Sequence, residues 1–451
     1  MASAQAVRAV RWVAVVAACS AVACGSSSGG SAAPDGGTGN HDAASPGDGA
    51  SASSSGGGSS GGHDSGSAGD SGGSLEGGAN PDSGSKGEGG AGPEGGPGAS
   101  GLWVMGYYAS WHDPANGGNY PVTAIDWDGL THVAAAFYLP DGKGGWDTGS
   151  FDQGTATTLI AAAHAHGKKA IASIGGAGSG PVFEGSTSAA NLTTFVGNLE
   201  ALITLGYDGI DIDWEGGNMT AAQDQTLQSS LVQALRTQSP NIVLTLTAGY
   251  ENENLLDDLS WYGTIAAQLD QMNLMTYGMA GAYQGWQSWH ASPLHWNSVS
   301  STPTGIDASV GHYLAANVPA AKLGIGIGFY GLCYTSPVTA PVQALGASTV
   351  VASDGTMSYP NILASYYSAS AYHYDAAAEA PYLTLGGSNA EKCTYVSYED
   401  PTSIAAKGAW AKGKGLGGVI LWEIGEGYVP SGATVQAQNP LLEAVKAGFL
   451  P

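Results

Sequence analysis

Eight short apolar runs, separated by longer segments of mixed polarity, constrain the fold of this chain more than any other feature. Such runs are typical of β-strands buried on both faces, and strands that alternate with helices predict a parallel sheet with right-handed crossovers. Eight repeats, without a Gly-rich dinucleotide loop after the first, favour an α/β fold of the (β/α)8 TIM barrel type over an open sheet. The runs are Leu102–Tyr108, Thr131–Tyr138, Lys168–Ile174, Asp208–Trp214, Asn241–Thr247, Leu269–Thr276, Lys322–Phe329 and Leu416–Trp422.

The segments between the runs contain helical patterns, and one gap breaks the rhythm. Ala190–Leu205 has apolar residues at helical spacing. The gap between the seventh and eighth runs is long and rich in Tyr, and we interpret about 332–398 as a small α+β insertion. Cys333 and Cys393 lie near its two ends. An exported domain permits a disulfide between them, and two free thiols are the alternative.

The N-terminal segment, 1–24, is interpreted as a signal peptide, because Arg8 and Arg11 precede a short apolar run and small residues. The run is too short for a comfortable transmembrane span. Its end resembles a bacterial lipoprotein box, which makes Cys24 a candidate lipid anchor; an ordinary cleaved signal peptide is the alternative. We therefore expect an exported bacterial protein, either an outer-membrane lipoprotein or a secreted, extracellular one.

Composition defines the next segment and excludes some partners. Residues 25–101 are almost entirely Gly, Ser, Ala, Asp and Pro, which predicts a disordered linker that precedes a barrel domain over 102–451. The formal net charge is -24, with 13 Lys and Arg against 37 Asp and Glu. Nucleic acid is an unsuitable partner, because neutralising phosphates requires clustered Lys and Arg.

The strongest chemical signal is an acidic strand, Asp208–Glu215. Alternate residues of a strand share a face, so Asp211, Asp213 and Glu215 should project together into the barrel, about 6.5 Å from one to the next. Packed there, the carboxylates repel one another, and at least one should hold a proton near neutral pH. A calcium site is the alternative, but metal loops need turns that converge their ligands. We therefore interpret the acids as catalytic, with Glu215 at the C-terminal end of the strand.

At this point the chain resembles glycoside hydrolase family 18, the chitinases and related barrels. The pattern Asp208-x-x-Asp211-x-Asp213-x-Glu215 is similar to the signature of that family. Further segments resemble other motifs of the family in the expected order, so the resemblance extends over about 102–425. These segments are Met105–Tyr108, Ser173–Gly176, Gln271–Tyr277, Val396–Ile404 and Gly417–Trp422.

The resemblance implies a retaining mechanism in which the substrate assists. Glu215 would be the general acid, and the acetamido oxygen of the sugar would attack C1 to form an oxazolinium ion. Asp213 would accept a hydrogen bond from the acetamido N–H, while Asp211 would raise the pKa of Asp213. Tyr277 would orient the acetamido oxygen, although a core Tyr is the alternative. Asp208 is interpreted as structural.

The same resemblance implies substrate-binding residues and shows departures from the family. Trp422 would form the floor under the sugar, Met275 would line the pocket, and Tyr107 and Ser173 would hydrogen-bond to Asp211. The family commonly has Asp where Gly278 stands, and often Arg where Leu332 stands. Aromatic residues after the sixth run are candidates for a leaving-side platform, with core packing as the alternative: Trp286, Trp289 and Trp296.

Together these features predict a monomeric chitinase that cleaves β-1,4 links in chitin or N-acetylglucosamine oligosaccharides. We expect it to need no metal ion and no organic cofactor. One alternative is an endo-β-N-acetylglucosaminidase that acts on N-glycans. Another is a non-hydrolytic chitin-binding lectin, although such lectins often lack the acid that Glu215 supplies.

Overall fold

The computed structural model describes residues 102–253, 255–283, 285–296, 304–351 and 354–451. The predicted signal peptide, 1–24, and all of the predicted linker, 25–101, lie outside the described residues. No helix within these ranges is long and apolar enough to cross a membrane.

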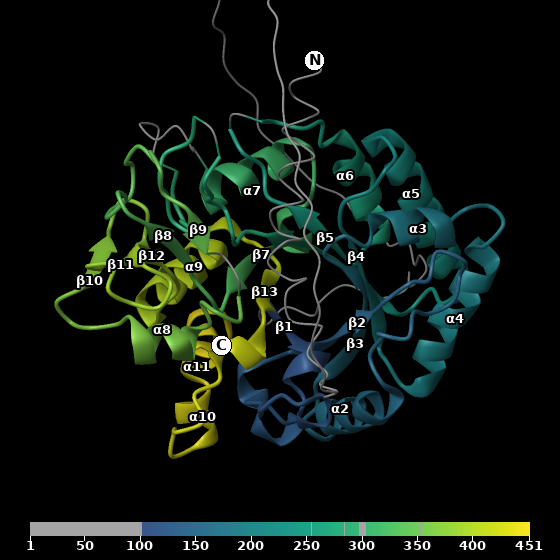
Figure 1. Ribbon diagram of the computed structural model, residues 1–451. Coiled ribbons are helices and arrows are strands. Elements are labelled where there is room, and N and C mark those ends of the chain that lie inside the picture. Colours follow the sequence, from purple (N-terminus) through teal and green to yellow (C-terminus); the bar gives the residue numbers. More distant parts are fainter. Residues whose placement is uncertain (1–101, 254, 284, 297–303, 352–353) are drawn as a thin grey trace, which may run out of the picture. The chain divides into compact units, whose positions relative to one another are not determined.

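Eight parallel strands close into a barrel in the order β1-β13-β7-β6-β5-β4-β3-β2. Each lies within one or two residues of an apolar run expected from the sequence, and the prediction of a TIM barrel is confirmed (Figure 1). The strands are β1 Trp103–Ala109, β2 His132–Tyr138, β3 Lys169–Gly176, β4 Gly209–Trp214, β5 Val243–Gly249, β6 Gln271–Met275, β7 Leu323–Gly328 and β13 Gly418–Trp422.

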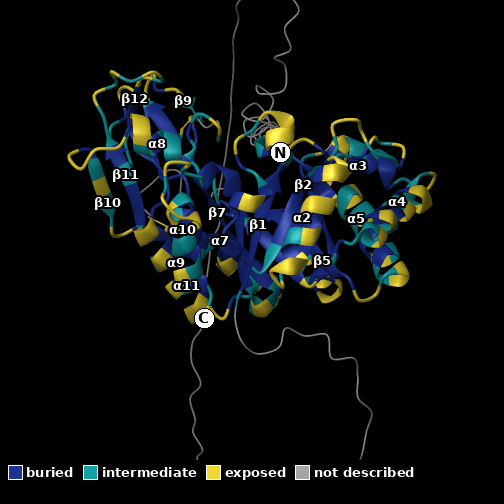
Figure 2. Ribbon diagram, turned by 90° about the horizontal axis from the view of Figure 1, so that it is seen from below, coloured by how far each residue is buried: buried dark blue, intermediate teal, exposed yellow. Residues whose placement is uncertain are grey.

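Amphipathic helices surround the strands, so the strands are dark blue in Figure 2 while the helices carry exposed outer faces. Helix α4 buries Phe195, Leu199 and Leu202, as its spacing predicted. Helix α9 begins at a capping box of Asp400 and Ser403, which satisfies free backbone N–H groups. The helices are α2 Gln153–Ala165, α3 Gly180–Ser186, α4 Leu192–Leu205, α5 Ala221–Gln238, α6 Ser260–Ile265, α7 Ile306–Ala315, α8 Tyr359–Ser365, α9 Pro401–Lys414, α10 Val435–Gln438 and α11 Pro440–Phe449.

Seven short 3-10 helices occur among the described loops. They are η1 Ser110–His112, η2 Pro114–Asn116, η3 Val122–Ala124, η4 Trp127–Gly129, η5 Ala266–Gln268, η6 Ala320–Lys322 and η7 Ile424–Gly427.

An antiparallel sheet lies between β7 and β13 in the chain, where the sequence predicted an α+β insertion. Its order is β10-β11-β12-β8-β9, and it lies at one side of the barrel (Figure 1, left). A disulfide joins Cys333 in β8 to Cys393 in β12, so the alternative of two free thiols does not apply. The strands are β8 Leu332–Thr335, β9 Val350–Val351, β10 Tyr372–Asp375, β11 Ala380–Thr384 and β12 Cys393–Ser397.

Removing the disulfide with Cys333→Ala and Cys393→Ala should lower the free energy of unfolding. The two residues are separated by 60 positions, and cross-links over loops of this size typically stabilise a domain by about 2 to 4 kcal/mol. Chemical denaturation of the oxidised protein and of the double variant measures the difference. The reduced wild-type protein is the control and should resemble the variant; equal stability of the oxidised protein and the variant would contradict the prediction.

Candidate active site

The inner face of β4 presents a column of acids. Asp211 and Asp213 lie on it and Glu215 follows directly, and their exposed fractions are 0%, 3% and 7%. Ile210, Ile212 and Trp214 instead pack into the large outer core. The alternation expected from the sequence thus places three carboxyl groups inside the barrel, one after another toward the C-terminal end of the strand.

Asp211, the innermost of the three acids, is held by hydroxyl groups from three other strands of the barrel. Its Oδ2 accepts hydrogen bonds from Tyr107 of β1 and Ser173 of β3, both at 2.8 Å. Its Oδ1 accepts one from Thr245 of β5 at 2.5 Å. Burial raises the pKa of Asp211, while these three hydrogen bonds oppose the rise. The contacts of Tyr107 and Ser173 are those expected from the sequence.

Asp213 lies in the middle of the column and accepts a hydrogen bond from Thr247 of β5. Burial raises its pKa well above the ordinary range, and the charges of Glu215 and Asp211 raise it further. A carboxylate between two others is difficult to ionise, because neither neighbour supplies positive charge. Asp213 is therefore expected to hold a proton when the neighbouring acids are ionised.

Glu215 lies where the strand ends, and burial alone raises the pKa of its carboxyl to about 7. A large fraction of its side chain is therefore protonated near neutral pH. The backbone here is fixed by Ser179, whose Oγ accepts from the Glu215 amide at 3.3 Å and donates to the Asp213 carbonyl at 3.1 Å. This position suits an acid that delivers a proton at the mouth of the barrel.

The glycines after Ser173 let β3 lie against this strand end. Gly175 has φ +110°, and a Cβ atom there would lie 2.2 Å from the Asp213 carbonyl oxygen. Gly176 has φ +95°, with the ring of Phe137 in the same restricted space. Only glycine meets both requirements, which explains the Gly-Gly pair physically.

Aromatic and apolar side chains surround the column inside the barrel. Met275, Tyr277 and Trp422 are partly exposed and pack against an inner cluster that includes Tyr107. The Trp422 ring stacks on Phe137, with 5.4 Å between centroids and an angle of 19°. Burial, followed by the charge of Asp213, raises the pKa of Tyr277 well above its usual range, so its hydroxyl remains a donor. A flat indole beside a phenolic donor suits a sugar ring.

Several side chains in this region were not anticipated from the sequence. Thr245 and Thr247 hold the two aspartates, and their alternation with Leu244 and Leu246 was the available signal. Trp111 lies 6.0 Å from Trp422 between ring centroids and is 41% exposed. It belongs to the three-residue helix η1, which is too short for a periodic sequence pattern to predict its position.

The remaining candidates have different positions. Asp208 lies at the N-terminal start of β4, where its carboxylate accepts from the Ala170 amide, as expected for a structural residue. Gly278 has φ +59°, and Leu332 is buried in the core of the insertion. Neither position gives a structural reason why the residue differs from the one common in the family.

The three Trp residues proposed for a leaving-side platform differ in their burial and contacts. Trp289 is fully buried and donates to the Thr304 carbonyl, so it packs in the core and cannot be a platform. Trp296 is 38% exposed. Trp286 is partly exposed, with its ring 4.6 Å from that of Tyr283 between centroids. Trp286 and Tyr283, but not Trp296, line a cavity of about 770 Å³ that also includes Leu345 of the insertion.

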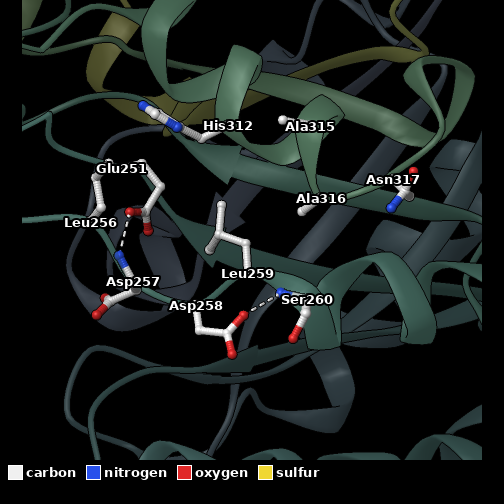
Figure 3. A pocket seen from close by; sticks show the side chains of 10 residues that line it. All are labelled: Glu251, Leu256, Asp257, Asp258, Leu259, Ser260, His312, Ala315, Ala316 and Asn317. Carbon is white, nitrogen blue, oxygen red and sulfur yellow. Dashed lines mark hydrogen bonds between the residues drawn. The ribbon is translucent and has the colours of Figure 1, made fainter. Parts of the chain in front are cut away.

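A second cavity of about 370 Å³ lies between the loop after β5 and the end of α7 (Figure 3). Its lining includes Glu251, Asp257 and His312, and the Asp257 amide donates to Glu251 at 3.0 Å. None of the column residues lines it. The candidate active site is therefore the column at the barrel mouth.

Comparison with known proteins is consistent with this geometry. Residues 103–427 match the family model described as glycosyl hydrolases family 18. Chitinase A1 of Niallia circulans is 27% identical over 400 residues, which cover 71% of this chain and 56% of that protein. Chitotriosidase-1 of Mus musculus is 28% identical over 276 residues, which cover 57% of this chain and 58% of that protein. The chain thus spans little more than half the length of these curated relatives.

Solved structures show the same fold. A chitinase from Rhizomucor miehei superposes with a TM-score of 0.63 and 22% identity, covering 76% of this chain and 99% of that chain. An N-acetylglucosaminidase from Paenibacillus barengoltzii superposes with a TM-score of 0.60 and 23% identity, covering 77% and 99%.

Glu215→Gln should stabilise the protein at alkaline pH. The pKa of Glu215 is about 7 in the folded protein against an ordinary 4.5. The protonated acid therefore contributes stability below the ordinary value that is lost as pH rises through the folded value. Gln does not ionise, so the free energy of unfolding of the variant should exceed that of wild type by at most about 3 kcal/mol near pH 8, and differ little near pH 4.

Urea denaturation across this pH range measures the effect. Glu391→Gln is the matched control, since Glu391 is partly exposed and lies outside the acidic column, so that the substitution removes a carboxyl group without altering the column. A Glu215→Gln variant that is no more stable than wild type at alkaline pH would show that Glu215 is already solvated in the folded state.

Proposed function

Because the chain belongs to glycosyl hydrolase family 18, we propose that it is a chitinase that hydrolyses β-1,4 links between N-acetylglucosamine units with retention. One observation carries the proposal. Glu215, at the mouth of the barrel, has a pKa of about 7, while the two other acids of its column lie deeper, among hydroxyl groups. This arrangement offers one transferable proton and one charge-stabilising pair.

In the first step, the Glu215 carboxyl donates its proton to the glycosidic oxygen while the bond from C1 to that oxygen breaks. The acetamido carbonyl oxygen of the same sugar forms a bond to C1 from the opposite face, which gives an oxazolinium ion. Water then attacks C1, the bond from C1 to the acetamido oxygen breaks, and the Glu215 carboxylate takes the proton from water. Two inversions give net retention.

Asp213 and Tyr277 would assist the acetamido group. The Asp213 carboxylate accepts a hydrogen bond from the acetamido N–H, which gains positive charge as the ring closes. As this positive charge develops, it stabilises the ionised form of Asp213, and the proton that Asp213 held can pass to Asp211, whose pKa is also raised by burial. Tyr277 donates its hydroxyl to the carbonyl oxygen and aligns it with C1.

Sugar binding would use the apolar surfaces of the same interior. Trp422 presents an indole face, braced by the stacked ring of Phe137, and Met275 fills the neighbouring wall. The insertion and the Trp422 floor favour chitin over the N-glycan core as substrate. We further propose an exported protein whose residues 25–101 act as a tether, with Cys24 as the candidate lipid anchor.

Glu215→Gln should lower kcat on a chromogenic N-acetylglucosamine oligomer by about 100-fold to 10,000-fold, the range for a positioned general acid. Oligosaccharide binding by the folded variant should persist, because the amide keeps the shape of the carboxyl. Asp208→Asn is the matched control from the same octapeptide and should retain activity. Unchanged turnover by Glu215→Gln contradicts the proposal. Cleavage of glycoproteins but not of graded chitin oligomers supports the N-glycan alternative.

The dependence of kcat/KM on pH should show an alkaline decline. Since the acid acts in its protonated form and its pKa is about 7, the rate should fall about tenfold for each pH unit above that value. Steady-state rates on a soluble oligomer from pH 5 to 9 give the profile. A rate that stays constant above pH 8 would mean that Glu215 does not deliver the proton.

A further inference from the structure

A second group of buried acids lies beside the proposed site and takes no part in the proposed mechanism. Glu423 directly follows β13, Glu426 lies in η7, and His112 ends η1. The ligand atoms of the three side chains all lie within 4.8 Å of one another, a spacing compatible with a metal ion. Elements after the first and the last barrel strands thus meet at one point.

The two glutamates of the group are buried, the His112 side chain is 22% exposed, and the charges of the group do not balance. Glu423 is 0% and Glu426 2% exposed, and His112 Nε2 lies 2.6 Å from Glu423 Oε1. Glu426 Oε2 has no hydrogen-bond partner among the described residues. A carboxylate oxygen that is both buried and unpartnered is costly, because it loses hydration without a compensating contact.

Asp354 adds a further acid next to this group. Its carboxylate accepts a hydrogen bond from the Trp422 indole N–H at 3.3 Å, and its charge acts on both glutamates. One imidazole, even when protonated, cannot neutralise three carboxylates. Without a cation, protons would therefore have to neutralise the group.

We infer that His112, Glu423 and Glu426 form a binding site for one first-row divalent cation of the Zn²⁺ or Mn²⁺ type. The imidazole Nε2 and one oxygen from each carboxylate would be its ligands. Zn²⁺ takes such nitrogen and oxygen donors at about 2.0 to 2.2 Å, and imidazole with carboxylate suits first-row metals. Ca²⁺ requires six to eight oxygen ligands, and the imidazole supplies none.

The site would support the sugar floor from behind and would not take part in the chemistry. It shares no residue with the acidic column, but Glu423 is bonded to Trp422 in the chain and Trp111 adjoins His112. The ion would therefore fix the segments that carry two neighbouring indoles, whose ring centroids are 6.0 Å apart. Its contribution is positional, and its existence does not depend on the proposed activity.

Isothermal titration and equilibrium dialysis of the full chain, stripped with a chelator, test the inference with ZnCl2, MnCl2 and CaCl2 as separate probes. We expect one Zn²⁺ or Mn²⁺ ion per chain, with binding at least tenfold weaker in Glu426→Gln and in His112→Gln. Mn²⁺ should also give a bound-ion signal in electron paramagnetic resonance that both variants lose. The comparison with these variants removes any contribution from residues 1–101.

Two variants serve as controls. Glu253→Gln alters a separate His–Glu pair, in which His312 Nε2 lies 2.7 Å from Glu253 Oε1. This variant should bind the ion as wild type does. Glu215→Gln should also bind the ion normally, which separates this test from that of the proposed function. Absence of binding at about 0.1 mM metal, equal binding by folded Glu426→Gln, or binding of Ca²⁺ in preference to the other ions would each overturn the inference.

Discussion

Burial of three carboxyl groups along one strand, with hydroxyl groups rather than cations as partners, is the constraint on which the rest of this site depends. An isolated buried carboxylate is strongly disfavoured, so the barrel has to supply either protons or donors. It supplies donors to Asp211, from Tyr107, Ser173 and Thr245. Protons must neutralise the remaining carboxyl groups. Glu215, the acid nearest the mouth of the barrel, is the one from which a proton could be transferred to a bound molecule.

The closed barrel is what makes this arrangement possible. Parallel strands place residues of neighbouring strands at matching heights, as in the pairing of Ser173 and Thr245 with Asp211. An outer ring of helices removes water from the backbone and leaves the interior to side chains. Gly175 then lets β3 approach the Asp213 carbonyl more closely than any residue with a Cβ atom could. The packing of the barrel strands therefore also determines the arrangement of the site residues.

The parts predicted from the sequence were those encoded by local periodicity. Apolar runs located the eight strands, and the alternation of Ile with Asp in β4 placed the acids inside. The partners Thr245 and Thr247 could be found only once the register between β4 and β5 was known, although their own alternation hinted at an inward face. Trp111, Phe137 and the group around Glu426 could not be predicted in this way, because they meet through loops and through the closure of the barrel.

The two buried acid groups of the barrel mouth show how local geometry selects a way to neutralise charge. In the column, the carboxyls succeed one another along a strand, and their spacing of two residues keeps them too far apart to converge on one ion. In the group of His112, Glu423 and Glu426, turns after two neighbouring strands bring the ligand atoms within 4.8 Å. Extended backbone therefore favours protonation, which catalysis requires, whereas converging turns favour a shared cation. Because Trp422 and Glu423 are consecutive in the chain, the group of His112, Glu423 and Glu426 lies directly next to the floor of the proposed sugar site.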